Sequence, residues 1–198
     1  MSIDSTIALV TLADVKEYMN IPADTDTRDA FIEGLINAHS ETIEKYCGRK
    51  FIKTTTAINE IFDGDSEAEY YVKNWPITET ISALYYRSLG DDTWTTLPAT
   101  YEFEQDNDTG LIRFTDGNIF WKGRRNWKVP YKYGYLIGDI PHDLKLACID
   151  LVTRKYKQYD ERLHGVSSKS FGDQSISYSL DNLPADIKAT LNRYRRIF

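Results

Sequence analysis

The chain has 198 residues, of which 41% are hydrophobic and 27% charged, and its formal net charge is -6 at pH 7. This composition is typical of a globular protein and too apolar for a disordered one. The acidic balance argues against a protein that coats nucleic acid, because phosphate binding requires clustered cations. No apolar run could span a bilayer, and the start, MSIDSTIALV, lacks the positive flank of a signal peptide. We therefore expect no membrane association, and synthesis and retention in a cytoplasm.

The first fifty residues predict two helices. Thr11 and Asp14 have the spacing of a capping box, and apolar residues recur at helical intervals until Pro22 ends the segment. Three acidic residues then suit the positive end of a second helix dipole: Asp24, Asp26 and Asp29. That helix is expected to end at Gly48, since glycine adopts the left-handed conformation of a helix terminus. Its apolar stripe consists of Phe31, Leu35, Ile36, His39, Ile43, Tyr46 and Cys47.

Residues 51–135 have a different pattern. Short runs of β-branched and aromatic residues alternate with Asp-Gly and Asn-Asp turns, which predicts an inserted antiparallel β lobe. Six tyrosines in this region could form a sugar-binding platform, although their alternation along strands favours cross-strand packing. They are Tyr85, Tyr86, Tyr101, Tyr131, Tyr133 and Tyr135.

The last third predicts two more helices joined by a polar arm. Pro141 opens a third helix, which is expected to run to Gly165 and to pack on the second. The Ser-rich residues 166–182 have too few apolar positions to bury a core, and Pro184 starts a final helix. The predicted fold is α+β: a small antiparallel helical bundle (1–50 and 136–165), an inserted antiparallel β lobe (51–135), and an extended arm with a C-terminal docking helix (166–198).

Catalytic signatures are missing from the sequence. It contains no GxxxxGK[ST], GxGxxG, HExxH or paired CxxC motif. The two cysteines, Cys47 and Cys148, lie in apolar helical patterns and are expected to be buried free thiols. Asp63, Asp65 and Glu67 resemble a calcium loop, but Asn74 occupies the position that requires a bidentate glutamate, so we interpret them as a hairpin turn. We predict no catalytic residue, metal or cofactor, and no enzymatic activity.

One segment of the predicted lobe mixes aromatic and basic side chains. Its residues are Trp121, Lys122, Arg124, Arg125, Trp127 and Lys128. Arginine and tryptophan are common in protein interfaces, and single-stranded nucleic acid stacks on such mixtures. A solvated turn with its tryptophans resting on the lobe is the interpretation that the pattern favours, and the other two remain open.

The C-terminal helix has a single narrow apolar stripe, made of Ile187, Leu191, Tyr194 and Phe198. A helix of about a dozen residues is marginal in water and needs a surface to lie on. The preceding arm could reach on the order of 50 Å at about 3.3 Å per residue. We therefore expect this helix, with Arg193, Arg195 and Arg196, to dock on another subunit in preference to the chain's own third helix.

Several stretches, taken together, have the order of a known family. LVTLADVKEYMNI is followed by an acidic linker and a long helix that ends in YCGRKF. IFDGD, WPIT and KVPYKYGY then span the lobe, and IPHDLKLA and the LP-led tail helix follow. In this order the sequence resembles the head-tail connector (adaptor, or head completion) proteins of long-tailed double-stranded DNA bacteriophages. The resemblance covers nearly the whole chain, although shorter family members are mostly helical and lack so large a lobe.

The resemblance implies a structural virion protein that forms a ring, commonly of twelve copies, between the portal and the tail. Its implied partners are the portal ring, tail or tail-completion proteins, other copies of itself, and passing double-stranded DNA that is not bound sequence-specifically. The implied location is the virion neck, after assembly in the host cytoplasm. The implied portal-docking residues are Ile187, Leu191, Arg193, Tyr194, Arg195, Arg196, Ile197 and Phe198. The alternative function is a module that binds carbohydrate or single-stranded nucleic acid through the aromatic lobe.

Overall fold

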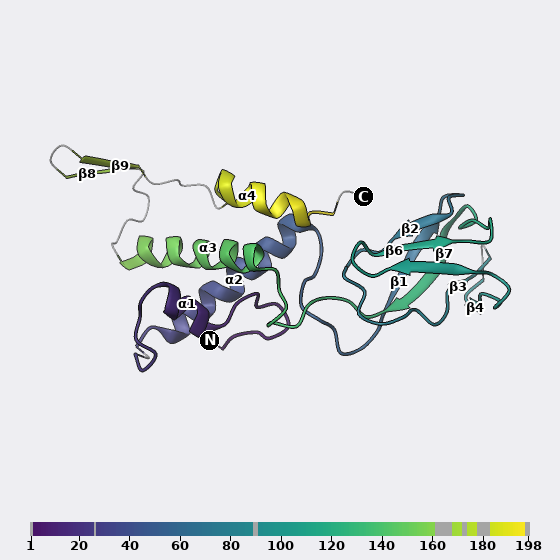
Figure 1. The fold of residues 1–198 in the computed structure, drawn as a ribbon, viewed down its shortest axis with the longest axis horizontal. Helices are drawn as coiled ribbons and strands as arrows, with labels where there is room; N and C mark the ends of the chain where they lie inside the picture. The colour runs from purple at the N-terminus through teal and green to yellow at the C-terminus, as the bar shows by residue number, and fades with distance from the viewer. Residues whose placement is uncertain are drawn as a thin grey trace. The chain divides into compact units, whose positions relative to one another are not determined.

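The computed structural model describes residues 2–25, 27–88, 91–160, 168–171, 174–177 and 183–196. The chain divides into two compact units. A helical unit comprises residues 1–48 and 139–195, and a β unit comprises residues 49–138, to which Arg196 is also assigned. Figure 1 shows the chain passing from the first helices into the β unit and back into the helical unit. Helices and antiparallel sheets are both present, which confirms the predicted α+β class.

The helical unit contains α1 (Leu12–Tyr18), α2 (Asp29–Cys47), α3 (His142–Asp160), α4 (Ala185–Leu191) and the short 3-10 helix η1 (Asn192–Tyr194). The capping box forms as predicted: the Asp14 backbone N–H donates to Thr11 Oγ1 at 3.1 Å, and the Thr11 N–H donates to Asp14 Oδ2 at 2.9 Å. α2 ends at Gly48, whose φ of 69° is left-handed. These termini follow from local sequence alone, since each depends on one or two residues.

α2 and α3 contact one another along their apolar faces, as the sequence predicts. The contributing side chains are almost fully buried: Ile32, Ile36, Ile43 and Cys47 from α2, and Leu144, Cys148, Leu151 and Val152 from α3. The segment before α1 adds Ala8, Leu9 and Val10, which have no exposed surface. The two long helices therefore share one core, and α1 contacts both of them.

Lys16 is an unexpected member of this interior, with only 5% of its surface exposed. Its ammonium group donates to the backbone oxygens of Ala23 (3.3 Å) and Thr25 (2.6 Å) and to Asp29 Oδ2 (2.8 Å). A buried lysine is tolerated only where its donors are satisfied. The side chain thus holds the α1–α2 connection against the start of α2.

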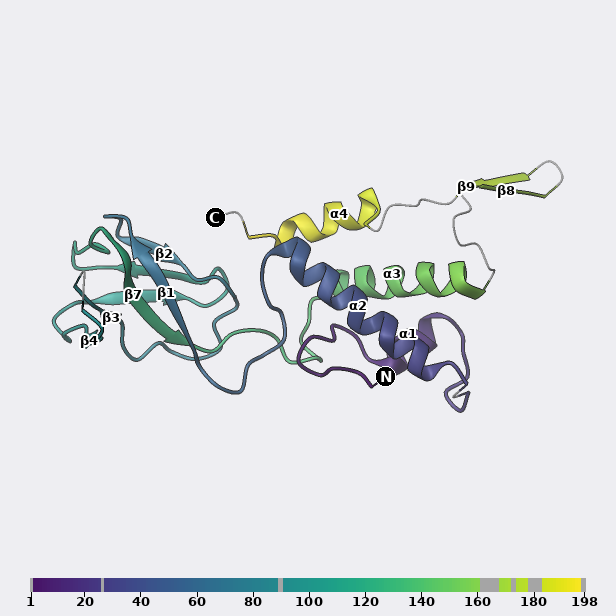
Figure 2. The same cartoon turned by 180° about the vertical axis from the view of Figure 1, so that it is seen from behind.

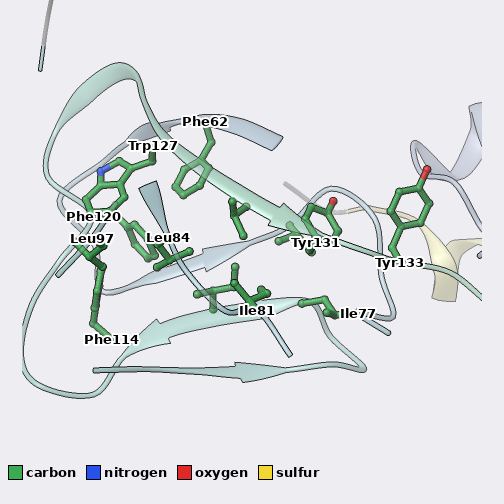
Figure 3. Close-up of a cluster of buried hydrophobic side chains, with 13 residues drawn as sticks. Phe62, Ile77, Ile81, Leu84, Leu97, Phe114, Phe120, Trp127, Tyr131 and Tyr133 are labelled. Carbon is green, nitrogen blue, oxygen red and sulfur yellow. The ribbon is translucent and has the colours of Figure 1, made fainter. Parts of the chain in front are cut away.

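The β unit is built from two antiparallel sheets. The first has the order β1 (Ile58–Gly64), β7 (Gly123–Tyr131), β3 (Tyr85–Tyr86), β4 (Thr95–Thr96), and the second the order β2 (Glu69–Tyr71), β6 (Leu111–Phe114), β5 (Phe103–Asp106). Figure 3 shows the apolar side chains that gather between the strands, among them Trp127, Phe120 and Leu84. The inward positions alternate along each strand, as in β7, where Trp127, Val129 and Tyr131 are buried.

Within the Ser-rich segment, the structure describes a two-stranded antiparallel hairpin of β8 (Ser168–Phe171) and β9 (Gln174–Ser177). The sequence predicts an extended arm over this stretch, so paired strands replace part of that arm. The rest of residues 161–182 lies outside the described residues.

Candidate interaction surfaces

The C-terminal helix packs on its own chain. α4 contacts both α3 and α2, and Figure 2 shows it running alongside them. Ile187 is 3% exposed and Leu191 is fully buried. The Cys47 thiol lies 3.7 Å from the Leu191 carbonyl oxygen, which places the last turn of α4 against the end of α2. The apolar stripe of the helix is therefore covered within the subunit.

Polar contacts hold the same segment at both of its ends. Near the start, the Arg154 guanidinium lies 2.9 Å from Asp186 Oδ2. Near the end, the Tyr46 hydroxyl donates to Asn192 Oδ1 at 2.8 Å, and the Tyr194 hydroxyl donates to Asp143 Oδ1. These contacts connect α4 and η1 to both long helices.

This packing corrects the expectation that the apolar stripe of the C-terminal helix docks on another subunit in preference to the chain's own third helix. The faces of α2 and α3 remain apolar beyond their mutual contact, and a two-turn helix with two buried aliphatic residues is enough to cover that remainder. Among the predicted docking residues, Ile187 and Leu191 are used internally. Arg193 and Arg195 remain exposed, with 69% of the Arg193 side chain accessible. Ile197 and Phe198 lie outside the described residues.

The aromatic-basic segment divides between the two faces of its sheet. Trp127 is completely buried, and its indole N–H donates to the Trp121 carbonyl oxygen at 3.3 Å, so it is not available for a partner. This corrects its assignment as a contact residue: strand alternation points it into the core. The neighbouring Lys128 faces outward, where its ammonium lies 4.4 Å from the Tyr85 ring centre and 4.9 Å from that of Trp94.

Trp121 is half-buried between two tyrosine rings. The Tyr86 ring centre is 5.1 Å away and the Tyr101 ring centre 5.9 Å away, both in edge-to-face geometry. Lys122 and Arg124 beside it are exposed. Aromatic packing of this kind fixes the position of the Trp121 ring, which leaves one side of it at the surface with two cations next to it.

A pocket of about 420 Å³ lies at this end of β7. It is lined by Tyr86, Arg87, Ser88, Trp121, Lys122, Gly123, Arg124 and Asn126. The lining contains three cations and no carboxylate. We call it the basic pocket.

The sequence reveals only half of the basic pocket. Tyr86, Arg87 and Ser88 come from β3 and the residues after it, about 35 positions before Trp121, and they reach the pocket because β3 pairs with β7. Arg87 Nε donates to the Arg125 carbonyl oxygen at 3.0 Å, and its guanidinium lies 4.6 Å from the Trp94 ring centre. No local motif marks that pairing. The sequence therefore points to Tyr86 only as one of six aromatic residues of the lobe, and does not point to Arg87 or Ser88.

The acidic residues interpreted as a hairpin turn do form local turn contacts. Asp65 Oδ1 accepts the Glu67 backbone N–H at 3.0 Å, and Asp63 Oδ1 accepts the Arg125 N–H at 2.6 Å. The turn does not close a hairpin, however, because the strands on either side, β1 and β2, belong to different sheets. Across the described residues, no group of three or more acidic, histidine or cysteine side chains is placed to hold a metal ion.

Several groups with shifted pKa values are buried side chains with structural partners. Burial raises the pKa of the Cys148 thiol to about 12, and neither cysteine forms a disulfide. Burial, followed by the nearby Glu60 carboxylate, raises the pKa values of the Tyr70 and Tyr131 phenols, both of which donate hydrogen bonds to Glu60. None of these groups lines the basic pocket, so what the pocket offers is charge, aromatic surface and hydrogen-bond donors for non-covalent contacts. None of the described helices is both long and apolar enough to cross a bilayer.

The family model of the head completion protein matches residues 8–197, which is nearly the entire sequence. The chain belongs to the head completion protein family. It is therefore a structural head-tail connector protein of a bacteriophage-type virion, as the sequence resemblance implies. A search of curated proteins finds no significant match.

Solved structures of gene transfer agent (GTA) particles have a similar fold. The neck of an empty GTA particle, computed with C6 symmetry, contains a chain that is 14% identical, with a TM-score of 0.60 over 100% of this chain and 94% of that one. The virion of a native GTA particle gives 15% identity and a TM-score of 0.60 over 100% and 94% of the two chains. The neck of a native particle, computed with C12 symmetry, gives 14% and 0.58 over 100% and 93%. At this identity the likeness concerns the fold, and it spans both units of this head completion protein.

Proposed function

We propose that this head completion protein forms a ring at the virion neck that connects the portal of the capsid to the tail and continues the DNA channel. The observation that carries this proposal is the family match over residues 8–197, supported by a fold that corresponds along its full length to chains of GTA necks and virions. In such a ring, the mutually contacting helices α1, α2, α3 and α4 would supply part of the channel wall.

The proposed partners are the portal ring on one side, tail or tail-completion proteins on the other, and further copies of the chain, twelve in the assembled virion. Double-stranded DNA passes through the ring without sequence-specific binding. The net charge of -6 supports a conduit of this kind, because an acidic wall repels the phosphate backbone. All of these roles use non-covalent contacts, and the protein acts without catalysis.

Portal docking is proposed for the exposed part of the C-terminal segment. Ile187 and Leu191 hold α4 on its own subunit, while Arg193 and Arg195 extend from the end of the helix towards solvent. The Arg195 guanidinium lies 5.8 Å from the Tyr46 ring centre, which orients it without neutralising it. Arg193 lies 3.4 Å from Asp143 Oδ2 but stays largely exposed, so it can also contact an acidic group of a portal subunit. Cations already held in place pair with such groups at little cost in conformational entropy.

The test is electron microscopy of the purified protein mixed with its portal ring. We expect a second ring stacked on the portal. The variant Arg193→Glu/Arg195→Glu should keep its thermal stability and lose this stacking, whereas Lys53→Glu/Lys73→Glu, which changes the charge equally at exposed sites of the β unit, should retain it. If wild-type protein never stacks, the connector proposal is wrong; if the arginine variant stacks normally, only the docking assignment is wrong.

The alternative binding module is not favoured by the side-chain arrangement. A stacking platform for sugars or bases requires several accessible rings, but Trp127 is fully buried and Tyr131 and Tyr133 are 3% and 8% exposed. Trp121, Trp94 and Tyr85 are half-buried, but the last two rings lie against the cationic groups of Arg87 and Lys128.

A further inference from the structure

We propose that the basic pocket of one copy receives the acidic β5–β6 turn of a second copy, so that the β units join head to tail. This inference rests on the proposed ring and names the surfaces that join its subunits. Two features of the β unit carry it: a pocket whose cations lack carboxylate partners within the described chain, and an acidic turn at the opposite end of the same unit.

The pocket gathers three cations with no carboxylate in its lining. Within the described ranges, Arg87, Lys122 and Arg124 form no ion pair with a carboxylate, whereas Arg28, Arg113, Arg154 and Arg193 all do. Asp63, which comes close to this region, accepts the backbone N–H of Arg125 at 2.6 Å. The pocket thus presents three charges together with the Trp121 ring, and its volume of about 420 Å³ accommodates a few side chains. An acidic protein segment is the complementary ligand.

The β5–β6 turn has the required charge. Asp106, at the end of β5, and Asp108, in the turn itself, are both exposed, and the nearby cation Arg113 is already paired with Glu104 and Glu69. Asp106 accepts hydrogen bonds from the Thr109 hydroxyl (2.8 Å) and from the Asp108 N–H (3.0 Å). These bonds hold the turn in one conformation and, with the Thr109 contribution the largest, lower the pKa of Asp106. A rigid anionic loop loses little entropy on entering a pocket.

The two features lie at opposite ends of the β unit. The pocket surrounds Gly123, where β7 begins. The turn lies beyond the other end of β7, because the Asn107 carbonyl oxygen accepts the Ile77 N–H at 2.8 Å and Ile77 bridges Tyr133. Figure 3 shows this separation, with Trp127 at one end of the core and Ile77 and Tyr133 at the other. Nine residues of strand span roughly 30 Å.

Complementary surfaces at opposite ends produce a heterologous contact. Such contacts repeat in one direction and close into a ring when the rotation between copies permits, whereas a two-fold dimer would need one self-complementary surface. Copies with a net charge of -6 repel one another, and pairing of the basic pocket with the acidic turn would offset this repulsion. Double-stranded DNA would instead require a broad basic face, which is not expected of a chain with a net charge of -6.

The experiment is sedimentation velocity of the full chain over a range of concentrations at low salt, with a charge-swap design. We expect the weight-average mass of wild type to rise above 22.9 kDa with concentration and to fall back at high salt. Lys122→Glu/Arg124→Glu and, separately, Asp106→Lys/Asp108→Lys should each remain monomeric. An equimolar mixture of these two variants should associate again. The acidic pocket of the first variant then meets the basic turn of the second, and the unchanged pocket of the second meets the unchanged turn of the first. Lys53→Glu/Lys73→Glu is the control with the same change in net charge and should behave as wild type.

A wild type that stays monomeric throughout, a pocket variant that associates normally, or a mixture that fails to recover would each overturn the proposal. A labelled oligonucleotide provides a further test. If it binds saturably to wild type, and Lys122→Glu/Arg124→Glu abolishes that binding but not self-association, the ligand of the pocket is phosphate and the proposal is wrong. Imaging with the portal separates this inference from the proposed function. A stacked ring formed by Lys122→Glu/Arg124→Glu would refute the pocket contact and leave the connector role intact.

Discussion

Replacing Leu191 by alanine tests whether the C-terminal helix belongs to its own subunit. Leu191 has no exposed surface and lies where α4 meets α2 and α3. A helix that depended on another molecule would leave this side chain in water in the free protein, and the substitution would then be nearly neutral. A helix packed as in the structure loses buried surface and gains a cavity, so the free energy of unfolding must fall.

The size of the effect follows from complete burial. Leucine-to-alanine changes in fully buried sites cost about 2–5 kcal/mol, and the position near the chain end allows some relaxation, so we expect about 3 kcal/mol. For a domain of this size, this corresponds to a decrease in Tm of roughly 6–12 °C. The measurement is urea unfolding of the free protein followed by circular dichroism at 222 nm, which reports the helical unit, with Tm from a thermal scan.

Leu146→Ala on α3 is the matched control. The same atoms are removed from a helix, but Leu146 is 47% exposed, so its loss should stay below about 1 kcal/mol. Deleting residues 185–198 should destabilise the free protein at least as much as Leu191→Ala. Equal and small effects of Leu191→Ala and Leu146→Ala would refute the intramolecular packing and restore the idea of a helix ordered only by a partner.

Three further predictions concern interior positions. Burial lowers the pKa of His39, so its neutral form is favoured in the folded state. The free energy of unfolding should therefore fall as the pH drops below about 6.5, where the unfolded chain takes up the proton. Urea titrations at pH 7.5 and 5 should show a smaller decline for His39→Phe than for wild type. A β-carbon at Gly64 would lie 1.8 Å from the Trp121 carbonyl oxygen, so Gly64→Ala should lower the free energy of unfolding by about 1–3 kcal/mol. Gly138→Ala is the control, because a β-carbon there meets open space, and it should leave the stability unchanged. Equal Tm values for the two variants would contradict this steric argument. Cys47 and Cys148 have no exposed surface and should react with a thiol reagent only at the rate of unfolding, and immediate labelling in native buffer would show that the α2–α3 core is open.

Local features were predictable because a few neighbouring residues determine them. The Thr11–Asp14 capping box and the left-handed Gly48 terminus are the clearest cases, and both are present. The apolar spacing of the two long helices likewise predicted their mutual packing, since residues three or four apart share one face. The α+β class and the order of elements followed from the same periodicities, and the order supported the family resemblance.

Other features are determined only by which distant segments of the chain meet in the folded structure. The amphipathic pattern of α4 requires a covered face, but it does not say whether the cover comes from the same chain; the remaining apolar surface of α2 and α3 settled that. Trp127 and Lys128 are adjacent in a stretch that reads as uniformly aromatic and basic, yet strand alternation sends one into the core and the other outward. Arg87 joins the basic pocket only because β3 pairs with β7. Periodicity reports how each element is oriented about its own axis, whereas the choice of partner is a property of the whole folded chain.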